Sequence, residues 1–344
     1  MELLETLCRA SGVSGFEDEV KQLMKKQLGK HADEVIEDSF GNVIARKGAG
    51  DKKIMLAAHM DEIGFMVKHV TEEGYLNFIK VGGIDNRILL HQKVIVKTEK
   101  GDVEGVIGSK PPHLMKDEER KKVVKHDEMF IDIGCRDKKE AEKKVSLGDP
   151  IIFSPTYGNL SRDVIYGKAV DDRVGCWALI EILKKIRKNI DAEVYACATT
   201  QEEVGLKGAR VAAYKINPDY AVAIDTTLAG DTPNVKPQES NLKLGEGPAL
   251  TVMEASGRGV ISHPKLHKVL CDTSKKKKIP TQIDILEGGM TDAAIIYLTR
   301  EGIPSSVVSI PTRYIHGPLS VFNLKDAQNT VKLIASALPS IAKL

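Results

Sequence analysis

The sequence predicts an α/β fold, in which a mainly parallel central sheet is flanked by helices and carries a small inserted all-β domain. After residue 164, apolar runs typical of buried strands alternate with helical patterns, as in a parallel sheet covered on both faces. Between residues 68 and 163 the segments are instead short, β-branched and separated by Gly, Asp or Pro turns. We therefore expect one domain over residues 1–67 and 164–344 and a second over residues 68–163.

The first domain is expected to begin with a helix. Ser14 and Glu17 have the spacing of a capping box, and apolar residues follow at helical spacing from Val20 onward. Residues 54–58 are a short apolar run, which suits a buried strand.

The alternation after residue 164 opens with a helix, whose apolar face consists of Leu179, Ile182, Leu183 and Ile186. The strands predicted after it are 192–199, 220–227, 248–254, 281–286 and 305–311. A final helix is expected to be capped by Asn323. In the inserted domain, Lys100 and Gly101 mark a hairpin tip between two β-branched runs.

Composition excludes several classes of protein. The chain has 344 residues, of which 42% are hydrophobic and 28% charged, which is typical of a globular protein. The net charge is only +2, so no overall field favours nucleic acid or an anionic membrane. The N-terminus lacks the basic region of a signal peptide, and no apolar run is long enough to span a membrane. Five scattered cysteines without a C-x-x-C pair are expected to be reduced. We expect a cytoplasmic protein.

Polar side chains gather where the predicted strands end. Ligands bind at this edge of an open sheet, because loops and helix N-termini converge there. The polar residues at this edge are His59, Asp61, Asp171, Asp172, Glu202, Glu203, Asp225 and His316. Taken singly, Asp225 fits better as a turn or cap residue, and the pair Asp171 and Asp172 fits better as a helix N-cap. The adjacent pair Glu202 and Glu203 is different, since two carboxylates ending an apolar strand repel one another unless a cation is present.

A site for two metal ions accounts for the whole set. Nitrogen and oxygen ligands without thiolate suit Zn²⁺, Co²⁺ or Mn²⁺, and carboxylates bridge two such ions at about 3.5–4 Å. In such a site Glu203 is expected to bind metal and Glu202 to act as the general base. Asp61 follows His59 by two residues, the spacing of a carboxylate that fixes the tautomer of the imidazole.

Seven segments resemble the tetrahedral aminopeptidases, a family of dinuclear metallo-aminopeptidases. They are AAHMDEIGFMV, VGGIDNRIL, PPHLMKDEERKK, YGKAVDDRVG, TTQEEVGLKGA, AIDTT and TRYIHGP, and they run in order over nearly the whole chain. The resemblance implies that His59, Asp171 and Asp225 hold one metal ion. It implies that Asp171, Glu203 and His316 hold the other, so that Asp171 bridges the two. It also implies dimers, formed through the inserted β domain, that assemble into a hollow tetrahedral dodecamer.

Two positions depart from the family pattern. His316 is followed by Gly317 and Pro318, where His-Ser-Pro is expected, and the turn from Gly288 to Ala294 carries Met290, where a shorter turn is expected. Both changes leave the metal ligands in place, and both are expected at the substrate pocket.

The predicted reaction is hydrolysis of the N-terminal peptide bond of peptide substrates. A deacylase of N-acyl amino acids on the same dinuclear site is the nearest alternative, and only the pocket separates the two. A cellulase, a name also used in this family, is disfavoured, because a glycosidase needs two carboxyl groups on opposite sides of the bond, about 5–5.5 or 6.5–9.5 Å apart. A non-catalytic metal-binding scaffold would need no general base beside Glu203.

Overall fold

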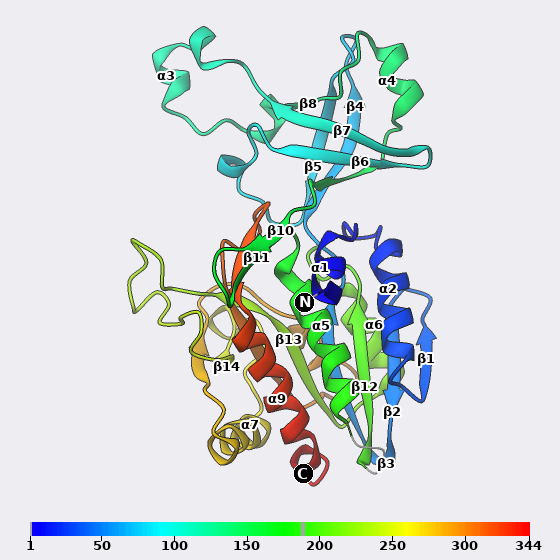
Figure 1. The fold of residues 1–344 in the computed structure, drawn as a ribbon, viewed down its shortest axis with the longest axis vertical. Helices are drawn as coiled ribbons and strands as arrows, with labels where there is room; N and C mark the ends of the chain where they lie inside the picture. Colours follow the sequence, from blue (N-terminus) through cyan, green and yellow to red (C-terminus); the bar gives the residue numbers. More distant parts are fainter. Residues whose placement is uncertain (1, 187–189) are drawn as a thin grey trace.

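The computed structural model describes residues 2–186 and 190–344. Figure 1 shows two parts, a large sheet with helices on both of its faces and a small barrel standing at one end of it. The large sheet has 11 strands, and the barrel is closed by six strands.

The strands of the large sheet come from both ends of the chain. They are β1 (Glu34–Glu37), β2 (Val43–Lys47), β3 (Ala49–His59), β10 (Tyr157–Asn159), β11 (Val164–Gly167), β12 (Asp191–Thr199), β13 (Tyr220–Leu228), β14 (Ala249–Met253), β15 (Gln282–Ile285), β16 (Ser305–Arg313) and β17 (Ser320–Asn323). The main path runs β1-β2-β12-β3-β13-β16-β17-β11-β10, and β14 and β15 branch from β16.

The sheet is mixed, so the prediction of a mainly parallel sheet applies to its centre only. Strands β12, β3, β13 and β16 pair in parallel. The pairs on either side of this centre, β1 with β2 and β16 with β17, are antiparallel. The reason is that short connections reverse the chain at these places, and a short connection can only join antiparallel neighbours.

Helices cover both faces of this sheet, as predicted. One face packs against α1 (Glu2–Arg9), α2 (Asp18–Gly29), α5 (Val170–Lys185), α7 (Pro264–Lys277) and α9 (Leu324–Ile341). The other face packs against α6 (Lys207–Ile216) and α8 (Ala293–Ile296). Strand β3 serves both cores, because Ile54 and Leu56 point to the first and Met55 and Ala57 to the second.

The barrel lies between β3 and β10 in the chain. Its strands are β4 (Gly64–Val70), β5 (Leu76–Val81), β6 (Lys93–Thr98), β7 (Gly101–Gly108), β8 (Phe130–Asp132) and β9 (Pro150–Phe153), and its connections carry the short helices α3 (Asp117–Arg120) and α4 (Lys138–Lys144). These strands begin four residues before the predicted insert of 68–163 and end before β10 and β11, which join the large sheet. The division of the chain into two domains stays a prediction.

The predicted capping box at the start of α2 is not formed. The helix begins at Asp18 with Glu17 as its N-cap, and Glu17 makes no side-chain cap. Its carboxylate instead accepts from the N–H groups of Gly15 and Gln201, at 2.7 and 3.2 Å. The Ser14 hydroxyl donates to Asp61 at 2.6 Å. Both side chains therefore serve contacts with distant segments, which the local spacing does not reveal.

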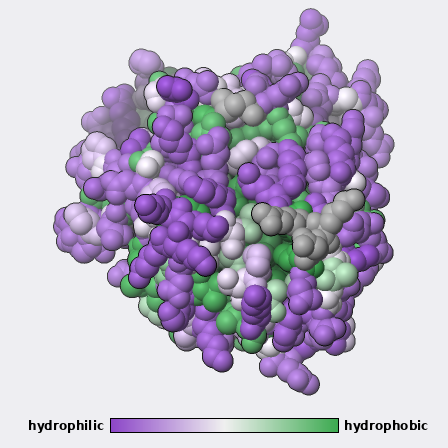
Figure 2. Space-filling view, turned by 60° about the horizontal axis from the view of Figure 1, so that its bottom comes forward, coloured by the Kyte–Doolittle hydropathy of each residue, from purple (hydrophilic) through white to green (hydrophobic). Residues whose placement is uncertain are grey.

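The outer surface is mainly hydrophilic. Figure 2 views one face of the molecule, where purple hydrophilic residues predominate and green hydrophobic residues are scattered between them. Among the helices that the structure describes, none is both long and apolar enough to cross a membrane.

Phe65 is expected to be a main contributor to the stability of the barrel, because it is fully buried and packs edge to face against Phe78 and Phe153, with ring centroids 5.1 and 5.2 Å away. Phe65→Ala should lower the free energy of unfolding by about 3–5 kcal/mol, as measured by chemical denaturation. Ile79→Ala is the matched control, since Ile79 lies in a barrel strand but is 39% exposed. Equal losses in the two variants would contradict the packing described.

Candidate active site

The predicted site residues converge at the carboxyl ends of the central strands. His59 is the last residue of β3 and lies opposite Thr199, the last residue of β12, in a parallel register. The chain therefore leaves β12 beside His59 and brings Glu202 and Glu203 to the same edge. Asp225 lies near the end of β13, and the segment after β16 returns His316 to this edge.

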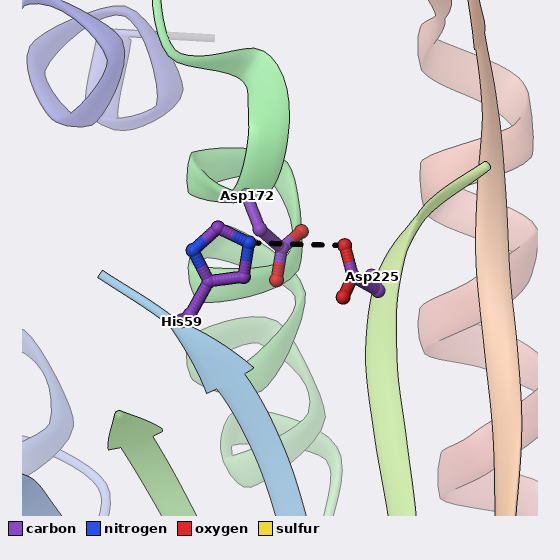
Figure 3. Close-up of side chains that lie close together, drawn as sticks. All are labelled: His59, Asp172 and Asp225. Atoms are coloured by element: carbon purple, nitrogen blue, oxygen red, sulfur yellow. Dashed lines mark ion pairs between the residues drawn. The ribbon is translucent and has the colours of Figure 1, made fainter. Parts of the chain in front are cut away.

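The His59 ring is surrounded by carboxylates. Its Nε2 atom lies 3.3 Å from Asp171 Oδ1, 3.8 Å from Glu202 Oε2 and 3.8 Å from Asp225 Oδ1. Figure 3 shows His59 and Asp225 reaching toward one another from neighbouring strands. His59 and Asp225 are both buried.

Asp171 lies between the two predicted histidines. One of its oxygens faces His59, and the other, Oδ2, lies 3.6 Å from His316 Nε2. His316 Nε2 also lies 3.2 Å from Glu203 Oε2, and this hydrogen bond is the main reason why the pKa of His316 rises to about 9. The structure thus brings Asp171, Glu203 and His316 together beside His59.

Asp172 is a member of the cluster to which the sequence assigned no role. It is fully buried, follows Asp171 through a cis peptide bond and points toward Asp225 and His59 (Figure 3). One ligand atom from each of His59, Asp172 and Asp225 falls within 4.8 Å of the others, and so does one from each of His59, Asp171 and Glu203. Asp172 Oδ1 accepts from the N–H of Gly175 at 2.9 Å.

Asp61 holds the loop that carries the two glutamates. Its Oδ1 accepts from the N–H of Glu202 at 2.9 Å, and its Oδ2 accepts from the N–H of Glu203 at 3.1 Å and from Ser14 Oγ at 2.6 Å. The side chain is fully buried. Burial raises its pKa, but the nearby His59 ring and the hydrogen bond from Ser14 outweigh this effect, so the pKa lies below its usual range. Asp61 is therefore a fixed negative acceptor.

The same residue also orients the His59 ring. The main-chain oxygen of Asp61 lies 3.2 Å from His59 Nδ1, whereas its carboxylate Oδ1 is 3.6 Å away. If Nδ1 carries the proton and donates to this carbonyl, Nε2 is left with its lone pair facing the carboxylates. The ring is thus held mainly by the backbone of Asp61, and the carboxylate mainly holds the glutamate loop.

The carboxylates of the site outnumber its two histidines. Burial raises the pKa of Glu202 well above its usual range, and Asp292 raises it further, against the lowering effect of His59. Burial also raises the pKa of Asp225 well above its usual range. Burial alone would lower the pKa of His59, but Glu202 and Asp171 raise it well above its usual value. The carboxylates here are short of positive partners, and the two histidines only partly supply them.

Divalent metal ions fit this set of donors. Asp171 Oδ1 and Asp172 Oδ2 are buried and have no hydrogen-bond partner within the described part of the chain. The groups of side chains close enough to share an ion offer imidazole nitrogens and carboxylate oxygens, a set that suits Zn²⁺, Co²⁺ or Mn²⁺. The nearest cysteine, Cys176, instead donates to the main-chain oxygen of His59 at 3.1 Å.

Asp292 is a buried carboxylate beside the cluster that the sequence did not identify. It is 2% exposed and its Oδ2 accepts from Thr199 Oγ1 at 2.5 Å, directly beside the start of the glutamate loop. Burial raises its pKa to about 6. The sequence feature that could have identified Asp292 is its position between the glycine-rich turn and α8.

The barrel contributes a wall to the site. The turn after β5 places Gly83 against the His316 ring, so that a Cβ atom there would lie 3.3 Å from His316 Nδ1. On the same side, a Cβ atom at Gly317 would lie 3.9 Å from Ile88.

A buried ion-pair cluster flanks the site. Lys168 Nζ lies 2.7 and 2.6 Å from the two carboxylate oxygens of Glu62, and Arg173 NH2 lies 3.4 Å from the first of them. All three side chains are at most 2% exposed. Arg173 Nε also donates to the main-chain oxygen of Met60 at 2.7 Å. Because Lys168 and Arg173 lie on either side of Asp171 in the chain, the cluster ties the start of α5 to the end of β3.

A cavity of about 460 Å³ opens beside the cluster. Its lining comprises His59, Asp171, Glu202, Glu203, Gly205, Leu206, Asp225, Thr226, Thr227, Leu228, Leu286, Gly288, Gly289, Met290, Thr291, Ile315 and His316. The cavity is large enough for an amino-acid side chain and part of a peptide.

Comparisons with known proteins point in one direction. A family model described as M42 glutamyl aminopeptidase matches residues 41–333. The structure of aminopeptidase APDkam598 from the archaeon Desulfurococcus kamchatkensis matches with a TM-score of 0.95 and 41% identity, over 98% of this chain and 94% of that one. The TET1 peptidase of Pyrococcus horikoshii, which can assemble into a tetrahedron or a large octahedral shell, matches with a TM-score of 0.88 and 35% identity, over 97% and 98%. Lysyl aminopeptidase of Pyrococcus furiosus is 35% identical over 99% of this chain and 97% of its own.

Lys168→Met is expected to lower the free energy of unfolding by about 3–5 kcal/mol, because it removes the closest positive partner of the buried Glu62 carboxylate. Chemical denaturation of the metal-free protein measures the loss. Lys268→Met, which breaks the exposed pair with Asp272, is the control and should change little. The double variant Lys168→Met/Glu62→Gln should lose less than Lys168→Met alone, and a larger loss would argue against the buried pair.

Proposed function

Because the chain belongs to the M42 family of aminopeptidases, we propose that it removes N-terminal residues from peptides with two divalent metal ions and a glutamate general base. The observation that carries the proposal is the arrangement of Asp171 between His59 and His316, with Glu202 and Glu203 at its side. This arrangement opens into the cavity described above.

We assign His59, Asp171 and Asp225 to one metal ion and Asp171, Glu203 and His316 to the other. The contacts of Asp171 with both histidines support its bridging role. Zn²⁺ or Co²⁺ suits these ligands, and Mn²⁺ is a further candidate. Such ions, when bound, lower the pKa of water and polarise a carbonyl group. Asp172 lies close enough to Asp225 and His59 to orient or replace a ligand of the first ion.

Glu202 is the residue we assign to proton transfer. It is buried, faces His59 at 3.8 Å and is held by its backbone N–H on Asp61. Its raised pKa suits a group that takes a proton from the attacking water and then passes it to the nitrogen of the leaving amine. Asp61 keeps Glu202 and Glu203 in fixed positions through both of its oxygens, so that one glutamate binds metal while the other stays free for the proton.

The larger assembly is also part of the proposal. We propose that the barrel, within the predicted insert of residues 68–163, forms a dimer contact, and that residues 1–67 and 164–344 form the catalytic domain. The dimers would assemble into a tetrahedral dodecamer in the cytoplasm, with peptides as substrates. The similarity to a TET1 peptidase that can assemble into a tetrahedron supports this arrangement.

Glu202→Gln is expected to lower kcat/KM for unblocked peptides by about 10²–10⁴-fold, because the amide cannot accept a proton from water. The assay follows release of free amino acid with added Zn²⁺ or Co²⁺, and a chelator should abolish it. Bound metal, measured by elemental analysis, should stay unchanged in Glu202→Gln and fall in the control variant Glu203→Gln. Hydrolysis of N-acyl amino acids without any release from free peptides would instead favour a deacylase.

Asp61→Asn is expected to lower activity by about 10–100-fold, since one amide group cannot accept from both glutamate N–H groups as the carboxylate does. The measurement is kcat/KM at saturating metal, with circular dichroism as the check on folding. Ser14→Ala removes only one of the three donors to Asp61 and should cost less. Unchanged activity in Asp61→Asn would show that the loop is held by other contacts.

A further inference from the structure

We propose that this site prefers peptides whose N-terminal residue is neutral and apolar, such as leucine or methionine, over peptides that begin with lysine or glutamate. The inference rests on the proposed aminopeptidase function and adds the class of substrate. It is drawn from the wall of the cavity beside His59 and His316, and above all from Met290.

The apolar members of the cavity wall are Leu206, Leu228, Leu286, Met290 and Ile315. They come from four separate parts of the chain: the start of α6, the end of β13, the turn after β15 and the segment before His316. The charged members of the lining are the residues already assigned to metal and proton transfer. No lysine or arginine of the described residues lines this cavity, and its only carboxylates are those assigned residues.

The turn that carries Met290 is anchored at both ends. On one side, Leu286 donates to the main-chain oxygen of Met253 at 2.9 Å and accepts from the N–H of Ser256 at 3.1 Å. On the other side, the Thr291 hydroxyl donates to the buried Glu254 carboxylate at 2.7 Å. The apolar wall is therefore in place before a substrate arrives.

Two of these apolar side chains face open space. Met290 and Leu228 are each 49% exposed, although both line the cavity. Next to Met290, a Cβ atom at Gly288 or Gly289 would meet no atom within 4 Å. An apolar side chain of a substrate would cover this exposed surface, which is favourable in proportion to the area removed from water.

A charged side chain in the same place would lose water without gaining a partner. The carboxylates of the cluster are committed to metal and to Glu202's proton transfer, so they do not serve as free counter-charges for lysine. A glutamate side chain would meet neither lysine nor arginine in the described lining. An unpaired charge loses part of its hydration at this wall, whereas an apolar side chain covers apolar surface, so the apolar residue is favoured. The site should therefore differ both from a lysyl aminopeptidase, such as the relative from Pyrococcus furiosus, and from a glutamyl one.

The test is a panel of tripeptides that share the last two residues and begin with Leu, Met, Lys or Glu, together with the N-acetylated Leu peptide. The metal-loaded full-length protein should show a kcat/KM for the Leu and Met peptides at least about tenfold above that for the Lys and Glu peptides. Fastest cleavage of the Lys or Glu peptide would overturn the inference and leave the aminopeptidase function standing. Cleavage of the N-acetylated peptide alone would overturn both.

Variants of Met290 test the wall itself. In Met290→Glu the ratio of kcat/KM for the Lys peptide to that for the Leu peptide should rise at least about tenfold, because a counter-charge has been supplied. In Met290→Lys the same should hold for the Glu peptide. Leu298→Glu is the matched control, since Leu298 is 61% exposed, follows α8 outside the barrel and is not part of the cavity lining, and its ratios should not change. A ratio is insensitive to the fraction of folded enzyme, so unchanged ratios in both Met290 variants would overturn the role of this wall.

Discussion

The hydrogen bonds from the Glu202 and Glu203 N–H groups to Asp61 are the interaction on which the rest of the site depends. Two adjacent glutamates on a loop have no inherent reason to point in different directions. The buried Asp61 carboxylate accepts from both backbone N–H groups with its two oxygens, and this fixes the position of the loop relative to the sheet. Its own carbonyl group sets the His59 ring at the same time. Asp61 therefore connects the end of β3 to the loop after β12. The positions of His59 and of the two glutamates both depend on this connection.

Buried charge is balanced in two different ways on the two sides of Asp61. Behind it, Glu62 is neutralised by the protein itself, through Lys168 and Arg173. In front of it, no lysine or arginine within residues 2–186 and 190–344 pairs with the carboxylates around His59 and His316, and burial raises the pKa of Glu202 and Asp225. The contrast is informative, because the same protein neutralises one buried glutamate with a lysine and an arginine and, among its described residues, provides neither for the carboxylates of the site. The unmatched carboxylates on the other side support the proposal that this site binds cations.

The sequence predicted which residues gather at the edge of the sheet, and their roles as metal ligands and general base stay predictions. His59 and the Glu202–Glu203 pair were recognisable because each follows an apolar run, and parallel strands must bring such ends together. The antiparallel pairs outside the centre were missed, since the direction of a strand depends on how the chain returns to the sheet, which periodicity does not encode. Ser14 and Glu17 match a local capping signal, yet their partners are 47 and 184 residues away. Asp172 and Asp292 were not assigned because only the tertiary fold shows that their side chains turn toward the cluster.

The close approach of Gly83 to the His316 ring has a consequence for how this chain is built from modules. An insert that merely joined subunits could be exchanged, shortened or excised at its two junctions, as a tag can. Here the turn after β5 lies directly against the His316 ring of the candidate site, although it belongs to the barrel. A chimaera that transfers the barrel between related proteins must therefore keep this glycine turn compatible with the histidine of the recipient. The segment to exchange is larger than the barrel and includes the residues around His316 that contact it.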